Sequence, residues 1–504
     1  MSATYGVDKR DVVPRWRDVR RTLLAGELPV HPPTPASQGQ LEFLELREDE
    51  WHEHPTETRA LEFVSTALIL GQLDRAADAL AFLSTDSPSR WVSQVRASEW
   101  PEAQGAPLDP AQPDSVASVG GQRARIGRLR RRVRRDPRQA LAWSELARCY
   151  TSLGLLPQAQ KALFVALRLA PSSRYVLRNA ASFYIHTGDP ERAHSVLTRA
   201  DATPGDPWLV AAEVATAHVA GRPSTLAKRG RRMVEGGDFS AFDLTELASE
   251  LATLELAAGK RQARRLFEKA LLDPNDNSLA QAEWASQHAS GINVSPEQRS
   301  EQTAAEARAL HAFHEGLWEE AFINAIVWQK DQFFSLSAAM AASFAGSVGL
   351  MRWGESFASA DIGLRVHPNN AGLLNNAAYA LVEIDDYVGA RQYLDRIPDQ
   401  ETIDESWITS VATRGLLAFR TGEIEAGRRL YSRAIRLAHR LAPGSAIEAM
   451  ANVMLAREEV RIGSDQWAAP LSVAIQLNRS VASPGTEAWI ARVEATLESL
   501  IRAP

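Results

Sequence analysis

The stretch ALAWSELARCYTSLGLLPQAQKALFVALRLAPSSRYVLRNAASFYIHTGDPERAHSVLTRA, residues 140–200, contains an internal echo. Five of its residues return 34 positions later, in the same order and as the same residue type. The pairs are Tyr150 and Tyr184, Gly154 and Gly188, Ala159 and Ala193, Leu163 and Leu197, and Ala166 and Ala200. A fixed period of this size indicates one supersecondary unit stacked on copies of itself. The stretch therefore predicts a helical solenoid.

Within one period, the apolar spacing predicts two antiparallel helices. The first stripe has the helical spacing i, i+3, i+4, i+7 and consists of Trp143, Leu146, Ala147 and Tyr150. The second stripe is Ala159, Leu163 and Ala166, whose small alanines let the two helices approach closely. Between the stripes, Gly154 can take the positive φ that ends a helix. Pro171 ends the second helix and begins the turn to the next unit.

This unit resembles the tetratricopeptide repeat, whose signature is Trp-x2-Leu-Gly-x2-Tyr, then Ala-x3-Phe, then Pro. It departs from the signature at Ala147, which stands for Gly, and at Leu163, which stands for Phe. The resemblance covers residues 140–441 and, more weakly, residues 57–90. It implies an all-α fold, a tetratricopeptide-like solenoid of helical hairpins wound as a right-handed α-superhelix.

The repeat pattern and the proline-rich stretches together predict the domain organisation. We expect an N-terminal arm over 1–56, an N-terminal repeat-like helical unit over 57–100, a Pro/Gly linker over 101–121, a tetratricopeptide-like solenoid over 122–443 with degenerate units near 207–239 and 276–300, and a C-terminal helical cap over 444–504. A solenoid needs such a cap because the last repeat otherwise exposes its apolar face.

Composition and targeting signals narrow the function classes. The net charge of −6 gives no global argument for nucleic acid. Cys149 is the only cysteine, so an intramolecular disulfide is excluded, and its helical position is typical of a small packing residue. Residues 1–21 are charged and precede no apolar stretch, which predicts no signal peptide. No run reaches about 18 apolar residues, so we expect no membrane partner and a cytoplasmic location.

An arginine-rich stretch runs from Arg123 to Arg138 and contains a single acid, Asp136. Helical spacing predicts one basic face, made of Arg128, Arg131, Arg132 and Arg135, and Arg125 is a further candidate binding residue of this segment. Such a face suits an acidic protein partner or a phosphate backbone, and it is also compatible with a solvated face or with pairing to acids such as Glu102 and Asp109. No aromatic residues alternate with these arginines, which disfavours single-stranded nucleic acid. A second basic run, 228–232, would favour nucleic acid if it shared the same face.

The resemblance also implies binding positions on the concave face, which the first helix of each unit lines. The positions that match the family's ligand contacts are Arg148, Tyr175, Arg178, Asn179, Asn375, Asn376 and Tyr379. An asparagine side chain can hydrogen-bond both the N–H and the C=O of an extended peptide, so these residues suit peptide capture. The alternative is that they are ordinary polar surface residues.

Catalytic and metal-binding signals are weak. His311 and His314 lie at i, i+3 on a predicted helix, but no third metal ligand is evident. There is no phosphate-binding loop, no nucleophile elbow and no Cys-x-x-Cys. We therefore expect no catalysis, no metal and no cofactor. The expected function is a non-catalytic scaffold or regulatory adaptor that binds a protein or peptide, with a nucleic-acid-binding or sensing subunit using Arg125–Arg138 as the alternative. Self-association as a homo-oligomer stays open.

Overall fold

The structure is a computed structural model, and it describes residues 38–69, 72–86, 119–135, 137–138, 140–299, 304–332, 335–397 and 404–502. Most of the expected arm (1–56) and linker (101–121) lies outside these residues. Every regular element in the described ranges is a helix, and they contain no strand. The prediction of an all-α helical-hairpin solenoid is confirmed. None of the described helices is both long enough and apolar enough to span a bilayer.

The described residues fall into two compact units, which divide between Ala304 and Ala305. We call them the N-terminal unit and the C-terminal unit and describe each by itself. The boundary lies inside the range 122–443 that the repeat pattern assigns to one solenoid. Residues 276–299, which belong to a stretch expected to be degenerate, contain the last two helices before it.

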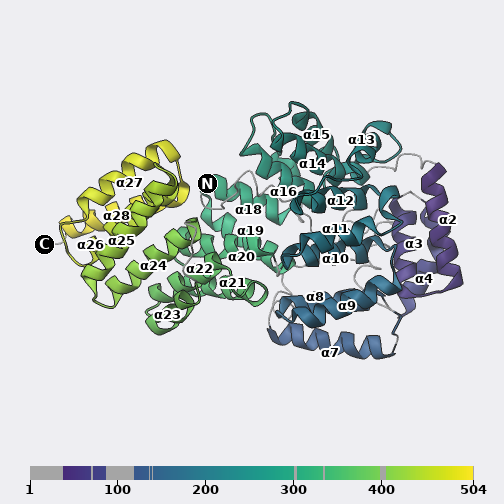
Figure 1. Ribbon diagram of the computed structural model, residues 1–504, viewed down its shortest axis with the longest axis horizontal. Helices are drawn as coiled ribbons and strands as arrows, with labels where there is room; N and C mark the ends of the chain where they lie inside the picture. Colours follow the sequence, from purple (N-terminus) through teal and green to yellow (C-terminus); the bar gives the residue numbers. More distant parts are fainter. Residues whose placement is uncertain are drawn as a thin grey trace. The chain divides into compact units, whose positions relative to one another are not determined.

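The N-terminal unit is a series of helical hairpins (Figure 1). Its helices are α2 (Gln38–Glu53), α3 (Glu57–Ile69), η1 (Leu73–Ala76), α4 (Ala77–Asp86), α7 (Val119–Arg135), α8 (Ala140–Ser152), α9 (Leu156–Leu169), α10 (Arg174–His186), α11 (Pro190–Thr198), η3 (Thr203–Gly205), α12 (Pro207–Val219), α13 (Ala227–Gly236), α14 (Ala241–Ala257), α15 (Gln262–Ala270), α16 (Asp276–Ser286) and α17 (Pro296–Arg299). The pairs α8/α9 and α10/α11 are the two copies of the 34-residue echo.

The C-terminal unit continues the same pattern with its own helices. They are α18 (Ala305–His314), α19 (Trp318–Asp331), α20 (Leu336–Phe344), the π-helical turn η4 (Ala345–Gly349), α21 (Trp353–Val366), α22 (Ala371–Glu383), α23 (Tyr387–Asp395), α24 (Glu405–Arg420), α25 (Ile424–Leu441), α26 (Ala446–Arg461), α27 (Ala468–Val481) and α28 (Pro484–Arg502). The repeat pattern predicts no hairpin beyond 443, yet α26 and α27 pack as one. Only α28 remains as a single helix after the last pair.

The turn inside each hairpin needs one residue with positive φ. Gly154 has φ +70°, as the sequence predicts, and the equivalent Gly188 has φ +82°. Two hairpins lack a glycine at this position, and there Met351 and Asp385 adopt the left-handed conformation instead, with φ +57° and +64°. The turn geometry is therefore kept even where it is strained for a residue with a Cβ atom.

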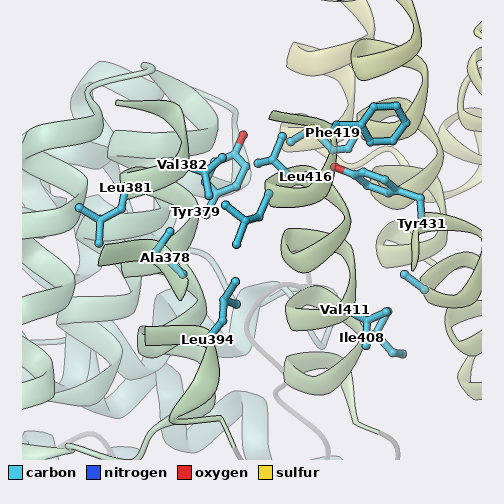
Figure 2. Close-up of a cluster of buried hydrophobic side chains, with 14 of the residues drawn as sticks. Ala378, Tyr379, Leu381, Val382, Leu394, Ile408, Val411, Leu416, Phe419 and Tyr431 are labelled. Atoms are coloured by element: carbon cyan, nitrogen blue, oxygen red, sulfur yellow. The ribbon is translucent and has the colours of Figure 1, made fainter. Parts of the chain in front are cut away.

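The cores lie between the stacked hairpins. On α9, Ala159, Leu163 and Ala166 are buried, as the helical stripe predicts. In the C-terminal unit a larger cluster joins α22 to α24 and continues to α28. Figure 2 shows part of this cluster, where side chains of α22 such as Tyr379 and Val382 face those of α24 such as Leu416.

Candidate interaction surfaces

Helix α7 is held to the N-terminal unit by one narrow apolar stripe. Ile126 and Val133 are buried and Leu129 is half-buried, and they pack against Leu146 and Cys149 of α8. Cys149 is thus a packing residue, and its burial raises the pKa of the thiol. The remaining surface of α7 consists mainly of arginine side chains.

Six arginines of α7 are exposed. They are Arg123, Arg128, Arg130, Arg131, Arg134 and Arg135, and we call them the arginine surface. Within the part of the chain that the structure describes, none of the six forms an ion pair. Of the predicted basic face, Arg128, Arg131 and Arg135 belong to this surface, whereas Arg132 and the further candidate Arg125 are half-buried at its edge.

The first helices of successive hairpins form a continuous inner row. Helix α8 contacts α10, α10 contacts α12, α12 contacts α14, and α14 contacts α16. The C-terminal unit has its own inner row, in which α20, α22, α24 and α26 contact one another in turn. Within each unit, the predicted binding residues therefore lie on first helices that contact one another, although these helices are distant in sequence.

Three of the predicted binding residues surround the carboxylate of Glu145, which the sequence analysis does not predict as a site residue. Glu145 of α8 is buried, and it accepts hydrogen bonds from the Arg125 guanidinium and from the Tyr175 hydroxyl. Arg148 lies 3.6 Å from the same carboxylate. The structure thus joins Arg125 of the arginine-rich helix to Arg148 and Tyr175 of the inner row.

Arg178 is 1% exposed, and its side chain lies in the interior of the N-terminal unit. Its Nη1 donates to Glu246 Oε2 at 2.6 Å and to the Trp208 carbonyl oxygen at 3.2 Å, and its guanidinium lies 5.3 Å from the centre of the Trp208 ring. Asn179 is also buried, and its Nδ2 donates to the carbonyl oxygen of Tyr175 at 3.0 Å. A buried guanidinium needs such an acid partner, because removing it from water is costly.

The predicted residues of α22 lie in the inner row of the C-terminal unit. Asn376 Nδ2 donates to Ser343 Oγ of α20 at 2.9 Å. Asn375 is 8% exposed, and its Oδ1 has no hydrogen-bond partner among the described residues. Tyr379 is buried, which raises the pKa of its hydroxyl, and it accepts a hydrogen bond from Arg457 at 3.2 Å. Neither unit therefore presents its predicted inner residues as an open surface.

Within each unit, successive hairpins stack so that their first helices touch. The chain is a solenoid of helical hairpins. No protein-family model and no curated protein matches it. Solved structures that resemble it include yeast Tom70 (TM-score 0.29, 13% identity, 75% of this chain and 93% of that chain). Another is the Cut9–Hcn1 hetero-tetramer of APC/C (TM-score 0.37, 11% identity, 90% of this chain and 93% of that chain). A third is the human IFIT1 dimer with PPP-AAAA (TM-score 0.30, 12% identity, 90% of this chain and 96% of that chain).

The last helix of the solenoid, α28, covers part of the inner row of the C-terminal unit. Trp489 of α28 is buried, and the guanidinium of Arg457 lies 4.8 Å from its ring centre. Pro484, at the start of α28, lies against the turn at Gly316, where an added Cβ would be 3.1 Å away. Helix α28 therefore reaches back from the last hairpin to the first hairpin of the unit.

The histidines singled out by spacing do not belong to a metal-binding cluster. The described part of the chain contains no group of three or more His, Cys, Asp or Glu side chains that could hold a metal ion. His311 and His314 both lie in the last turn of α18. The arginine surface and the two inner rows are thus the candidate sites that the geometry provides.

Proposed function

We propose that this chain is a non-catalytic scaffold or adaptor that binds an acidic partner protein through the arginine surface of α7. The observation that carries the proposal is a set of six exposed guanidiniums that form no ion pair with any described residue, on a helix whose opposite stripe is packed against α8. Guanidinium groups bind carboxylates through paired hydrogen bonds. Because α7 is held in place by its packed stripe, little backbone ordering is required when such a partner docks.

A protein partner is favoured over nucleic acid by where the second basic run lies. That run (228–232) is on α13, and Figure 1 shows α7 and α13 at opposite edges of the N-terminal unit. Arg231 is moreover engaged by Glu255. The two runs therefore do not form one continuous phosphate-binding strip, and the net charge of −6 adds no attraction for a polyanion.

The inner row is the second proposed contact. Arg148, Tyr175, Arg178 and Asn179 of the N-terminal unit are engaged within the fold, as are Asn376 and Tyr379 of the C-terminal unit. We assign these residues to a structural role within the inner row, where they set its shape and charge. A bound peptide would then be held by neighbouring polar groups that have no partner among the described residues.

The experiment is affinity capture from a native lysate, with and without nuclease, using the wild type and two charge-reversed variants. One variant carries Arg128→Glu, Arg131→Glu and Arg135→Glu on α7. The matched control carries Lys228→Glu, Arg229→Glu and Arg232→Glu on α13, which are also exposed and change the net charge equally. We expect one protein to be recovered by the wild type and the control in both nuclease conditions, and to be lost with the α7 variant.

Two other outcomes would redirect the proposal. Recovery that disappears with nuclease would identify nucleic acid as the ligand of α7. Equal recovery by both variants would make the arginine surface a solvated face and leave the inner row as the binding site.

A further inference from the structure

Helix α2 carries a row of acids on its solvent side. Glu45, Asp49 and Glu53 follow one another at intervals of four residues, which places them on one face of the helix, and all three are exposed. We call them the acidic stripe. Leu44 and Trp51, on the opposite face, are buried in the core that α2 shares with α3. None of the three acids forms an ion pair with a described residue.

Two other acids of the same helix are neutralised within the fold. Glu48 pairs with Arg75, and Glu50 pairs with Arg47. The acidic stripe receives no such cation from the described residues. Like charges one helical turn apart repel each other and weaken the helix that carries them. A cationic partner would remove that repulsion, so the stripe favours binding to a basic surface.

The arginine surface has a row of matching length. Arg128, Arg131 and Arg135 lie opposite the packed stripe of α7, and none of them forms an ion pair with a described residue. From Arg128 to Arg135 the helix rises about 10 Å, and from Glu45 to Glu53 it rises about 12 Å. Three cations and three anions are therefore presented over nearly the same length of helix.

The two rows belong to one unit but do not meet within it. Helix α2 packs on α3, whereas α7 packs on α8. Figure 1 shows α2 and α7 at different edges of the N-terminal unit. Each row faces away from the helix on which it is packed, and no ion pair among the described residues joins α2 to α7. A contact between the rows is therefore a contact between two copies of the chain.

We propose that the arginine surface binds the acidic stripe of a second copy of this chain. Arg128, Arg131 and Arg135 of one copy then pair with Glu45, Asp49 and Glu53 of the other. This inference rests on the proposed function, because it names the acidic partner of α7. Each copy offers one surface of each sign, so the same contact joins two copies reciprocally or links several in series.

The strength of the contact depends on ionic strength. One exposed ion pair contributes little in water, and three pairs in register act together. All six side chains are exposed, so salt screens them. Self-association should therefore be concentration-dependent and should weaken as salt is raised.

The experiment is sedimentation velocity of the full chain over a range of protein concentrations, at about 50 mM and about 500 mM salt. The wild type is compared with two charge-reversed variants. The α7 variant carries Arg128→Glu, Arg131→Glu and Arg135→Glu, and the α2 variant carries Glu45→Arg, Asp49→Arg and Glu53→Arg. We expect each variant alone to raise the dissociation constant of self-association by about tenfold or more, because like charges now face each other.

Mixing the two variants is the decisive measurement. The acidic α7 of one variant faces the basic α2 of the other, and the remaining two surfaces keep their original signs. The mixture should associate as the wild type does, although neither variant does so alone. Restored association also shows that both variants are folded. The Lys228→Glu, Arg229→Glu, Arg232→Glu variant changes the net charge as the α7 variant does, and it should self-associate normally.

Three results overturn the assignment. One is a wild type that stays monomeric at low salt. Another is an α2 variant that associates as the wild type does, which would mean that other acids, such as Glu102 and Asp109 of the linker, meet the arginines. The third is a mixture that fails to associate.

Lysate capture separates this inference from the proposed function. If the wild type is monomeric and a different acidic protein is captured by the wild type and the α2 variant but not by the α7 variant, the proposed function stands and self-association fails. If the mixture associates and the α7 variant still captures the protein that the wild type captures, that protein binds elsewhere and only self-association stands.

Discussion

Arg492 Nη1 donates a hydrogen bond of 2.6 Å to the carbonyl oxygen of Val348, a residue 144 positions earlier in the chain. The other guanidinium nitrogen, Nη2, donates to the carbonyl oxygen of Gly349. Both carbonyls belong to the π-helical turn η4, where the regular helical hydrogen-bond ladder is interrupted. One side chain of the last helix thus satisfies a backbone irregularity in the second hairpin of the C-terminal unit.

We expect Arg492→Ala to destabilise the C-terminal unit by about 1–3 kcal/mol, because two backbone carbonyls of η4 lose a charged donor. Hydrogen exchange should increase first at residues 345–352. Arg502→Ala is the control: among the described residues Arg502 pairs only with Glu498, on an exposed helix end, and its loss should cost less than about 0.5 kcal/mol. Unchanged exchange at η4 in Arg492→Ala would contradict a structural role for α28.

Gly349 marks a close approach within the same turn. A Cβ added at Gly349 would lie 2.6 Å from the Trp318 ring, whereas one added at Gly354 meets nothing within 4 Å. We expect Gly349→Ala to cost about 1–3 kcal/mol through overpacking. Gly354→Ala should be neutral or slightly stabilising, since it reduces the freedom of the unfolded chain. Urea denaturation of both variants measures the difference, and equal stabilities would refute the close packing at Trp318.

Leu163 and Phe164 are neighbours with opposite environments. Leu163 is 2% exposed in the core between repeats, and Phe164 is 55% exposed. Leu163→Asp should cost about 3–5 kcal/mol, because it opens a cavity and buries an unpaired charge. Phe164→Asp should stay within about 1 kcal/mol of the wild type. Circular dichroism during urea unfolding compares them, and a Leu163→Asp protein of normal stability would mean that the repeat register is wrong.

Glu250 should make the stability of the N-terminal unit depend on pH. Because its pKa is raised in the folded state, mainly by burial, its stabilising contribution is complete below the ordinary glutamate pKa of about 4.3 and is lost as pH rises through the folded-state pKa. Glu250→Gln removes this dependence. The advantage of the variant should therefore grow with pH by up to about 1.4 kcal/mol per pH unit across that window. Parallel stability curves for the two proteins would show that Glu250 ionises normally.

Local spacing is sufficient to predict the helices and the hairpin register. The stripes around Trp143 and Leu163 repeat every 34 residues, and Gly154 marks the turn with the positive φ that the structure shows. The same logic could have found the hairpin α26/α27, whose turn contains Gly463 with φ +69°. These features depend on residues within one or two helical turns, so sequence patterns report them directly.

Long-range contacts depend instead on the summed rotation from each hairpin to the next, which no single repeat records. That rotation buries Arg178 against Glu246, 68 residues away, and returns Arg492 to Val348. It also leaves Arg128 and Arg131 exposed while Arg125 turns inward to Glu145. The sequence alone does not distinguish an arginine that faces solvent from one that pairs with an acid. The stacking of the hairpins, and not the neighbouring residues in the chain, determines which partner an arginine meets.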